Sequence, residues 1–520
     1  MTTSPSPPPS FNFAEHLIAR NAARADRIAY LDDRTQLTYG ELASRVRRCS
    51  SMLREQGLRR EERVLLLAHD SVDWPVAFLG ALHAGVVPVA VNTLLPPADY
   101  AFILAHSRAR AAIVSGALLP SFERAMESGK HEVATVWIIG DTRTATHRDF
   151  AKDAVDAREA KAAPTHADDV AFWLYSSGST GAPKGAVHTH ANAYWTDALY
   201  AQNVLRLTED DVCFSAAKLF FAYGLGNALT FPLSAGATTV LMAERPTPKA
   251  VFQRLVEQRA TVFYGVPTLY AAMLAAPDLP ARTDVALRLC VSAGEALPRD
   301  IGERFTAHFG VEILDGIGST EMLHIFLSNL AGDVHYGTTG VPVPGYEVEL
   351  RGEDGREVAE GEVGDLFIRG PSAALMYWTN RDKSRATFQG EWTKSGDKYL
   401  RRADGYYVYA GRGDDMLKVS GLYVSPFEVE AALVQHPAVL EAAVIGKQDA
   451  EGLTKTKAFV VLKSGESADS DLEDALKAFV KDKLAPYKYP RYIEFVPELP
   501  KTATGKIQRF RLREREQGRP

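Results

Sequence analysis

Short, fully apolar runs alternate with longer segments of helical periodicity over about four hundred residues. The runs do not alternate with polar residues, which is typical of strands buried on both faces of a mainly parallel sheet. They cover residues 64–68, 86–91, 111–115, 135–140, 170–177, 238–242, 261–266 and 287–294. Strand–helix alternation of this kind predicts a large doubly wound α/β domain. An amphipathic pattern over residues 11–30 predicts a helix in front of it.

The pattern changes after Tyr336. Strand-like segments joined by Gly/Asp turns predict a β-rich subdomain over residues 336–413. The next stretch is rich in glycine and charge and predicts a hinge. Beyond it the predicted order is helix, strand, strand, helix, strand, at residues 426–435, 442–445, 457–462, 471–484 and 492–496. This order predicts a small α+β C-terminal domain.

These patterns divide the chain into three parts. Residues 1–10 are rich in Pro and Ser and predict a disordered tail. Residues 11–413 form the predicted N-terminal domain, with the β-rich subdomain at its end, and residues 414–520 form the predicted mobile C-terminal domain. A chain of 520 residues is long enough for more than one domain.

Composition narrows the possible partners. Lys and Arg number 59 against 65 Asp and Glu, so the net charge of −6 favours neither nucleic acid nor an anionic membrane as a partner. The cysteines Cys49, Cys213 and Cys290 match no metal-ligand spacing and predict reduced thiols in the core. No apolar run reaches ~18 residues, so we expect no transmembrane span. We predict a cytoplasmic monomer or homodimer.

The strongest local signal is the segment YSSGSTGAPKGAVHTH at residues 175–190, which follows a predicted strand and precedes a predicted helix. Glycines let backbone N–H groups approach a phosphate without a side chain in the way. Hydroxyls can donate to phosphate oxygens, and Lys184 supplies charge. The spacing is not that of the common P-loop, because Gly178 and Gly181 are too close and Gly185 follows the lysine. A flexible surface loop is the alternative interpretation.

Five further segments follow in order: SAGEALP (292–298), DGIGSTE (315–321), KSGD (394–397), GRGDDMLKVSG (411–421) and PKTATGKIQR (500–509). Together with residues 175–190 they resemble the motifs of the adenylate-forming superfamily. This superfamily includes acyl- and aryl-CoA synthetases, luciferases and peptide-synthetase adenylation domains. Because the motifs run in family order along nearly the whole chain, the resemblance implies that the protein binds ATP and activates a carboxylic acid as an acyl-adenylate.

The resemblance implies roles residue by residue. The implied nucleotide-binding residues are Ser176, Ser177, Gly178, Ser179, Thr180, Gly181, Lys184, Gly294, Glu295, Asp315, Gly316, Ser319, Thr320, Asp397 and Arg412. Asp397 and Arg412 suit the ribose, since a carboxylate accepts from hydroxyls and a guanidinium donates in a fork. Asp315 could meet the exocyclic amine of adenine. One departure is Ile317, where relatives usually carry an aromatic residue, so adenine stacking would rest on aliphatic contact.

The implied catalytic residues are Lys506, Thr180, Lys184 and Glu321. Glu321 offers an oxygen ligand to Mg²⁺. Lys506 would clamp the carboxylate and the α-phosphate, where its charge offsets that of the transition state. Without the resemblance, Lys506 would be interpreted as one more exposed lysine and Glu321 as a surface residue or helix cap.

The second half of the implied reaction is transfer of the acyl group to the thiol of CoA. In the family the C-terminal domain rotates between two discrete poses about a hinge, which is Asp414 here. Lys418, Val419 and Gly421 lie just beyond it and would face the acyl-adenylate from the CoA side.

The implied acyl-binding residues are Phe221, Ala222, Tyr223, Gly318, His324 and Ile325. Positions 221 and 222 are apolar, whereas relatives that activate amino acids carry an aspartate nearby, so an amino acid is not expected. Phe220 and Phe221 add bulk that argues against a long acyl tunnel. A flat apolar slot suits a small aromatic carboxylic acid. The segments FFAYGLGN and STEMLHIF look most like those of benzoate-CoA ligases and other aryl-CoA ligases.

Several alternatives remain open from the sequence. The chain could load a carrier protein in place of CoA, or act as a medium-chain acyl-CoA synthetase. A luciferase-type oxidoreductase and a nucleotide-binding regulator without catalysis are further alternatives. Core packing is the plain interpretation of Tyr223 and the phenylalanines, and for His324 it is a hydrogen-bonded packing role.

Overall fold

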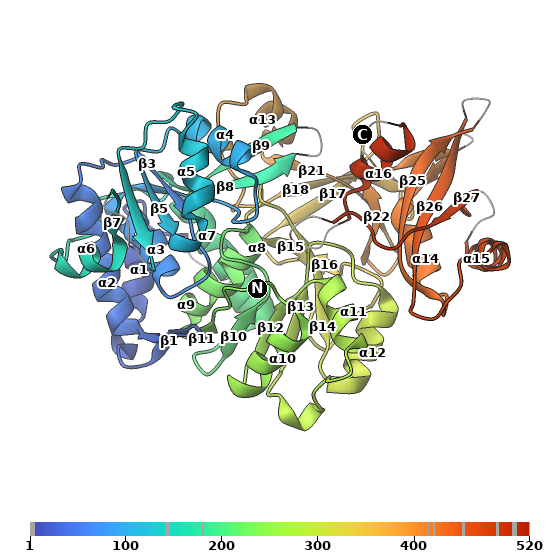
Figure 1. Ribbon diagram of the computed structural model, residues 1–520, viewed down its shortest axis with the longest axis horizontal. Helices are drawn as coiled ribbons and strands as arrows, with labels where there is room; N and C mark the ends of the chain where they lie inside the picture. The colour runs from blue at the N-terminus through green and yellow to red at the C-terminus, as the bar shows by residue number, and fades with distance from the viewer. Residues whose placement is uncertain are drawn as a thin grey trace.

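The computed structural model describes residues 6–140, 146–178, 181–413, 415–419, 422–449, 453–484, 488–501 and 507–518. Two large sheets dominate the N-terminal part (Figure 1). The first has the strand order β19 (Met376–Tyr377), β9 (Gly181–Thr189), β8 (Val170–Gly178), β4 (Val87–Ala90), β3 (Arg63–Leu67), β5 (Ala111–Ser115), β6 (Thr135–Ile139), β7 (Arg148–Asp149). From β8 to β7 all neighbours are parallel, whereas β9 and β19 are antiparallel additions at one edge.

The second sheet has the order β16 (Val341–Pro342), β15 (Ile325–Ser328), β14 (Ile313–Gly318), β13 (Leu289–Ser292), β12 (Val262–Gly265), β10 (Val212–Ser215), β11 (Thr238–Val240), β1 (Ile28–Leu31), β2 (Gln36–Thr38). Its strands are parallel from β14 to β1. The apolar runs of the sequence form the buried strands of both sheets, which confirms the predicted doubly wound α/β architecture.

The helices of the N-terminal part cover the faces of these sheets. They are α1 (Phe13–Arg20), α2 (Tyr39–Glu55), α3 (Asp73–Ala84), α4 (Pro97–Ser107), α5 (Leu119–Met126), α6 (Phe150–Asp156), α7 (His190–Thr196), α8 (Ala222–Leu225), α9 (Phe231–Ala235), α10 (Pro248–Glu257), α11 (Pro267–Ala275) and α12 (Arg299–Phe309). Short 3₁₀ segments lie at η1 (Ala22–Arg24), η2 (Gly116–Leu118) and η5 (Arg282–Asp284). Two π-helical segments, η3 (Asp197–Leu205) and η4 (Gly226–Thr230), follow α7 and α8. One core cluster joins side chains of α1, α3, α7 and η4 to strands of the first sheet.

A β-rich subdomain and a C-terminal unit complete the chain. The subdomain contains β17 (Glu347–Arg351), β18 (Val363–Arg369), α13 (Arg381–Thr387), β20 (Phe388–Gln389), β21 (Trp392–Arg401) and β22 (Tyr407–Arg412). The C-terminal unit contains β23 (Leu417–Val419), β24 (Leu422–Val424), α14 (Pro426–Val434), β25 (Val439–Gln448), β26 (Thr454–Leu462), α15 (Ser470–Lys483), β27 (Tyr492–Phe495) and α16 (Arg509–Glu516). It lies to one side in Figure 1, beside β22, where Tyr409 and Phe427 meet edge to face.

Two local predictions differ from the structure. Residues 11–30 do not form one helix, because α1 ends at Arg20 and Asn21 caps it by donating to Leu17 O. From Ile28 the chain forms β1, which pairs with β11 through Tyr30 and Leu31. The predicted disordered tail is also too long, since Ser10 pairs with His166.

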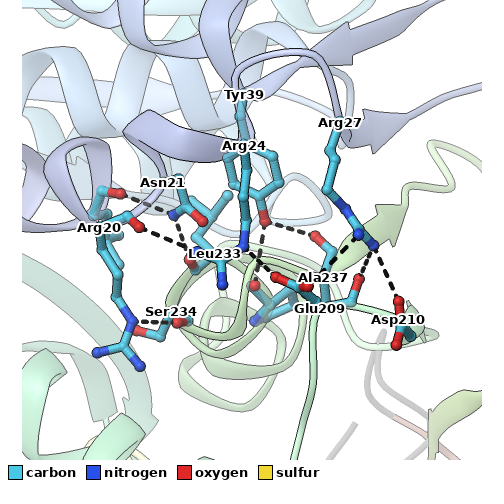
Figure 2. A network of polar contacts seen from close by, with 12 residues as sticks. Arg20, Asn21, Arg24, Arg27, Tyr39, Glu209, Asp210, Leu233, Ser234 and Ala237 are labelled. Carbon is cyan, nitrogen blue, oxygen red and sulfur yellow. Dashed lines mark hydrogen bonds and ion pairs between the residues drawn. The ribbon is translucent and has the colours of Figure 1, made fainter.

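The segment after α1 ties the two halves of the N-terminal part together (Figure 2). Asn21 Nδ2 donates to Leu233 O at 2.7 Å, and Tyr39 Oη donates to Ala237 O at 2.7 Å. Arg24 pairs with Glu209 at 2.5 Å. These contacts join the end of α1 and the start of α2 to α9 and to the loops before β10 and β11.

The cysteines are buried with free thiols, as predicted. Every helix in the described part of the chain is too short or too polar to cross a lipid bilayer.

Candidate active site

The glycine-rich segment forms a hairpin rather than a loop that leads straight into a helix. It continues β8 and turns back as β9, and α7 begins only at His190. Ser176 lies opposite Lys184, and Gly178 opposite Gly181. Ser179 and Thr180 lie outside the described residues, and of Ser177 only the backbone is described.

The adenine-side residues lie at two neighbouring strands, some after the end of β13 and one within β14. Gly294, with φ +98°, and the half-buried Glu295 come directly after β13. Asp315 lies in β14 and is 3% exposed, and its backbone carbonyl accepts from Asn329 N at 2.9 Å. Burial raises the pKa of Asp315 well above its usual value, and no described residue is a hydrogen-bond partner of its Oδ1. An orphaned acceptor at this position is compatible with a donor from a ligand.

The segment after β14 is held by a contact within itself, by β9 of the first sheet and by the residues before β19. Ser319 Oγ accepts from Met322 N at 3.1 Å, which closes a tight turn. The His188 ring, through Nε2, contacts Thr320 O at 2.8 Å, and Glu321 O accepts from Ala374 N at 2.7 Å. Neither His188 nor Ala374 was selected from the sequence, and only the meeting of β9 with this turn reveals them.

Tyr377 joins the glycine-rich hairpin to Glu321. Its hydroxyl donates to Glu321 Oε1 at 2.5 Å, and Lys184 Nζ lies 5.3 Å from the centroid of its ring. Desolvation by burial, together with the Glu321 carboxylate, raises the pKa of Tyr377, so its oxygen keeps its proton. Sequence analysis missed this residue, because no signal marks it before β19 is paired with β9.

The two predicted ribose-binding residues lie opposite each other. Asp397 on β21 pairs in register with Arg412 on β22, and Arg412 Nη1 is 3.3 Å from Asp397 Oδ1. Gly396 has φ +83°, and a Cβ there would lie 3.1 Å from Arg412 Nη2, so a side chain would crowd the guanidinium. The antiparallel pairing of β21 and β22 thus places a carboxylate and a guanidinium together.

The predicted acyl-binding residues divide into partly exposed and buried ones. Phe221, Ala222 and Tyr223 are partly exposed at the start of α8. The Tyr223 hydroxyl lies within 3.2 Å of both Gly265 O and Val291 O, which hold it at the ends of β12 and β13. Ile325 is 1% exposed, and its side chain packs against Gly316 of β14. A Cβ added to Gly316 would lie 3.0 Å from Ile325 Cγ2.

His324 is 2% exposed and enclosed by aromatic rings. Its Nε2 lies 3.3 Å from Tyr223 O and 3.2 Å from Asn227 Oδ1, and the ring of Phe231 is 4.5 Å away between centroids. Burial lowers the pKa of His324 to about 3, so the imidazole is neutral at physiological pH. Gly318 makes room for its backbone, since a Cβ at Gly318 would lie 2.6 Å from His324 C. Its Nδ1 is buried without a hydrogen-bond partner among the described residues, which is compatible with contact to a ligand.

The predicted hinge and CoA-side residues are only partly described. Asp414, Gly421 and Lys506 lie outside the described residues, and of Lys418 only the backbone in β23 is described. Val419 is 6% exposed and packs in the core of the C-terminal unit.

The neighbouring Asp415 pairs with Arg513 at 2.6 Å. This contact joins the residue after the predicted hinge to α16.

No group of three or more His, Cys, Asp or Glu able to hold a metal lies among the described residues. A single carboxylate at Glu321 nevertheless fits Mg²⁺, which proteins usually bind through one or two carboxylates together with substrate phosphates. Glu321 Oε1 is oriented by the Tyr377 hydroxyl, as ligating carboxylates commonly are.

Comparison with known proteins shows the family of this chain. Residues 18–378 match the model of the AMP-binding enzyme family, and residues 428–506 match the model of the AMP-binding enzyme C-terminal domain. The chain belongs to the AMP-binding enzyme family.

Within that family the chain is similar to aryl-CoA ligases. It is 59% identical to a benzoate-CoA ligase of Thauera aromatica, over 97% of this chain and 96% of the relative. The solved structure of a benzoate CoA ligase from Burkholderia xenovorans LB400 is 64% identical, with a TM-score of 0.92 over 97% of this chain and 100% of that one. A structure of an anthranilate CoA ligase in complex with anthranoyl-AMP is 42% identical, with a TM-score of 0.94 over 98% of each chain.

Proposed function

We propose that this chain is an ATP-dependent, AMP-forming aryl-CoA ligase whose acid is benzoate or a close analogue. The observation that carries the proposal is the convergence of Lys184 and Glu321 on Tyr377, which brings the glycine-rich hairpin to the turn after β14. The similarity to benzoate-CoA ligases over nearly the full length of the chain supports the choice of acid.

In the first half-reaction, a carboxylate oxygen of the acid attacks the α-phosphorus of ATP. A new O–P bond forms, and the bond to the bridging oxygen breaks, with its electron pair leaving on pyrophosphate. Lys184 would bind the phosphates, and Asp397 with Arg412 would orient the ribose. Mg²⁺, when bound at Glu321, would neutralise phosphate charge. Lys506 would stabilise the charge that develops at the α-phosphate.

In the second half-reaction, the thiolate of CoA attacks the acyl carbon and AMP leaves with the electron pair of the C–O bond. The family rotation about Asp414 would replace Lys506 by the segment around Lys418, Val419 and Gly421.

A small aromatic acid fits the local chemistry of the acyl-binding residues. The partly exposed Phe221, Ala222 and Tyr223 offer an apolar surface that suits a flat ring. His324, neutral beneath them, would add no charge to the slot. An α-amino acid would need a carboxylate partner, and positions 221 and 222 are apolar.

The test is AMP release with ATP, Mg²⁺ and CoA across benzoate, hydroxy- and aminobenzoates, cinnamate, hexanoate, palmitate and phenylalanine. We expect a CoA-dependent optimum at benzoate or a small analogue. A preference for hexanoate or palmitate would keep the chemistry and refute the aromatic slot. Benzoate-dependent pyrophosphate release without CoA turnover would point to a carrier protein as acceptor, and no AMP from any acid would refute the proposal.

A further inference from the structure

Tyr377 is one buried residue that contacts two of the predicted site residues from separate parts of the chain. Its ring faces Lys184 of the glycine-rich hairpin, with Nζ 5.3 Å from the ring centroid. Its hydroxyl donates to Glu321 Oε1 at 2.5 Å. The two contacts use different parts of the phenol, so they can be removed one at a time.

The position of Tyr377 is fixed from several sides. The residue is 3% exposed and pairs with Ala186 on β9, two residues from Lys184. Its amide N donates to Ser384 Oγ at 2.9 Å, and the ring of Phe388 lies 5.4 Å away. Because strand pairing and packing lock the ring, its contacts with Lys184 and Glu321 are made from a rigid element.

The hydroxyl contact constrains how Glu321 can ligate. A hydrogen bond to Oε1 orients the carboxylate plane and leaves Oε2 as the oxygen for a cation. Loss of such an orienting partner typically weakens metal binding by about 10-fold to 100-fold.

The ring contact constrains Lys184. A lysine has a flexible four-carbon stem, and an ammonium over a tyrosine face is attracted electrostatically by the ring. The ring therefore restricts where the charge of Lys184 can lie relative to the phosphates.

We propose that Tyr377 is a positioning residue that aligns Glu321 for the divalent cation and Lys184 for the phosphates of the same nucleotide. The inference rests on the proposed ATP-dependent function, and it assigns to one side chain the geometric link between the metal and phosphate subsites.

The test compares Tyr377→Phe, which removes only the hydroxyl, with Tyr377→Leu, which also removes the aromatic face. The control is Tyr406→Phe, since the Tyr406 hydroxyl also donates to a carboxylate, Asp333 Oδ2 at 2.6 Å, away from the predicted site residues. Binding of α,β-methylene-ATP is measured calorimetrically in EDTA and across a Mn²⁺ titration, and thermal unfolding is recorded for every variant.

We expect Tyr377→Phe to raise the Mn²⁺ concentration for half-maximal binding by about 10-fold or more, with nucleotide affinity in EDTA unchanged. Tyr377→Leu should in addition weaken binding in EDTA. A Tyr377→Phe variant whose Mn²⁺ dependence equals that of the wild type and of Tyr406→Phe would overturn the inference.

A double-mutant cycle with Glu321→Gln provides a second readout. The inference requires that Tyr377→Phe has little further effect on the Mn²⁺ dependence once Glu321 is changed, and full additivity would overturn it. These binding measurements do not use turnover. If the wild type made no AMP from any acid, the proposed reaction would be refuted, and the Mn²⁺ titrations would still decide the role of Tyr377.

Discussion

Gly226 lies so close to His324 that a Cβ added to Gly226 would be 2.3 Å from His324 Cδ2. Gly226 begins the π-helical segment η4, directly after α8, which carries Tyr223. The missing side chain leaves the space that the imidazole fills beneath the acyl-binding residues. The shape of the predicted acyl pocket therefore depends on a glycine that itself need not touch the substrate.

Gly226→Ala is expected to destabilise the protein by about 1–3 kcal/mol, because the methyl group overpacks a filled site. We also expect a higher KM for benzoate, with a smaller change in KM for ATP, because displaced His324 would move Tyr223. Thermal unfolding and steady-state kinetics measure both effects. The control is Gly352→Ala, where the nearest atom to a new Cβ is the side-chain oxygen Asp354 Oδ1 at 3.2 Å. Equal behaviour of the two variants would contradict the prediction.

His324 should contribute no ionisation to catalysis at neutral pH. Burial lowers its pKa to about 3, so the imidazole stays neutral between pH 5 and 9. The profile of kcat/KM for benzoate should therefore have the same limbs in the wild type and in His324→Gln, although KM rises in the variant. A limb near pH 6–7 that vanishes in His324→Gln would show that the histidine titrates during turnover.

Asp197→Asn should stabilise the protein more at high pH than at low pH. Asp197 is 2% exposed, and burial raises its pKa from 3.8 to about 7. Between these values the unfolded carboxyl is ionised and the folded one is not, so the wild type loses about 1.4 kcal/mol of stability per pH unit as pH rises. Asparagine lacks this dependence.

Urea unfolding of the two proteins at pH 5, 6, 7 and 8 measures the effect. The advantage of Asp197→Asn over the wild type should grow by about 3 kcal/mol from pH 5 to pH 8 and level off above about pH 7. Asp278→Asn, at an exposed position, is the control. A pH-independent difference for Asp197→Asn would show that burial does not raise the pKa of this carboxyl.

Glu430→Gln should destabilise the C-terminal unit by about 3–5 kcal/mol, because it removes one partner of a buried ion pair. Glu430 is 6% exposed and accepts from Arg509 Nη2 at 2.5 Å and from Val444 N at 2.7 Å. Unfolding monitored by limited proteolysis should show that this unit unfolds before the rest of the chain. Glu441→Gln breaks the more exposed pair with Lys501 and should cost under about 1 kcal/mol. Similar losses in both variants would argue against a special role for the buried pair.

Local pattern in the sequence was sufficient for the elements whose neighbours are close in the chain. The buried strands β5 and β13 and the helices α14 and α15 lie within a few residues of their predicted ranges, because apolar runs and caps mark them directly. The hairpin return β9 was missed, since residues 181–189 become a strand only through pairing with β8 and β19, and β19 comes almost two hundred residues later. The end of α1 depends on Asn21, whose second contact is Leu233.

The candidate site also divides into features that local sequence predicts and features that depend on contacts between separate elements. The sequence alone determined the family, the order of the motifs and the candidate residues, because each motif is a short continuous segment with its own chemistry. Only the tertiary structure decided that Tyr377 links Lys184 to Glu321, that Arg412 faces Asp397, and that His324 is enclosed under Gly226. Those relationships join residues on separate elements, and their distances follow from sheet register and packing, which no local pattern encodes.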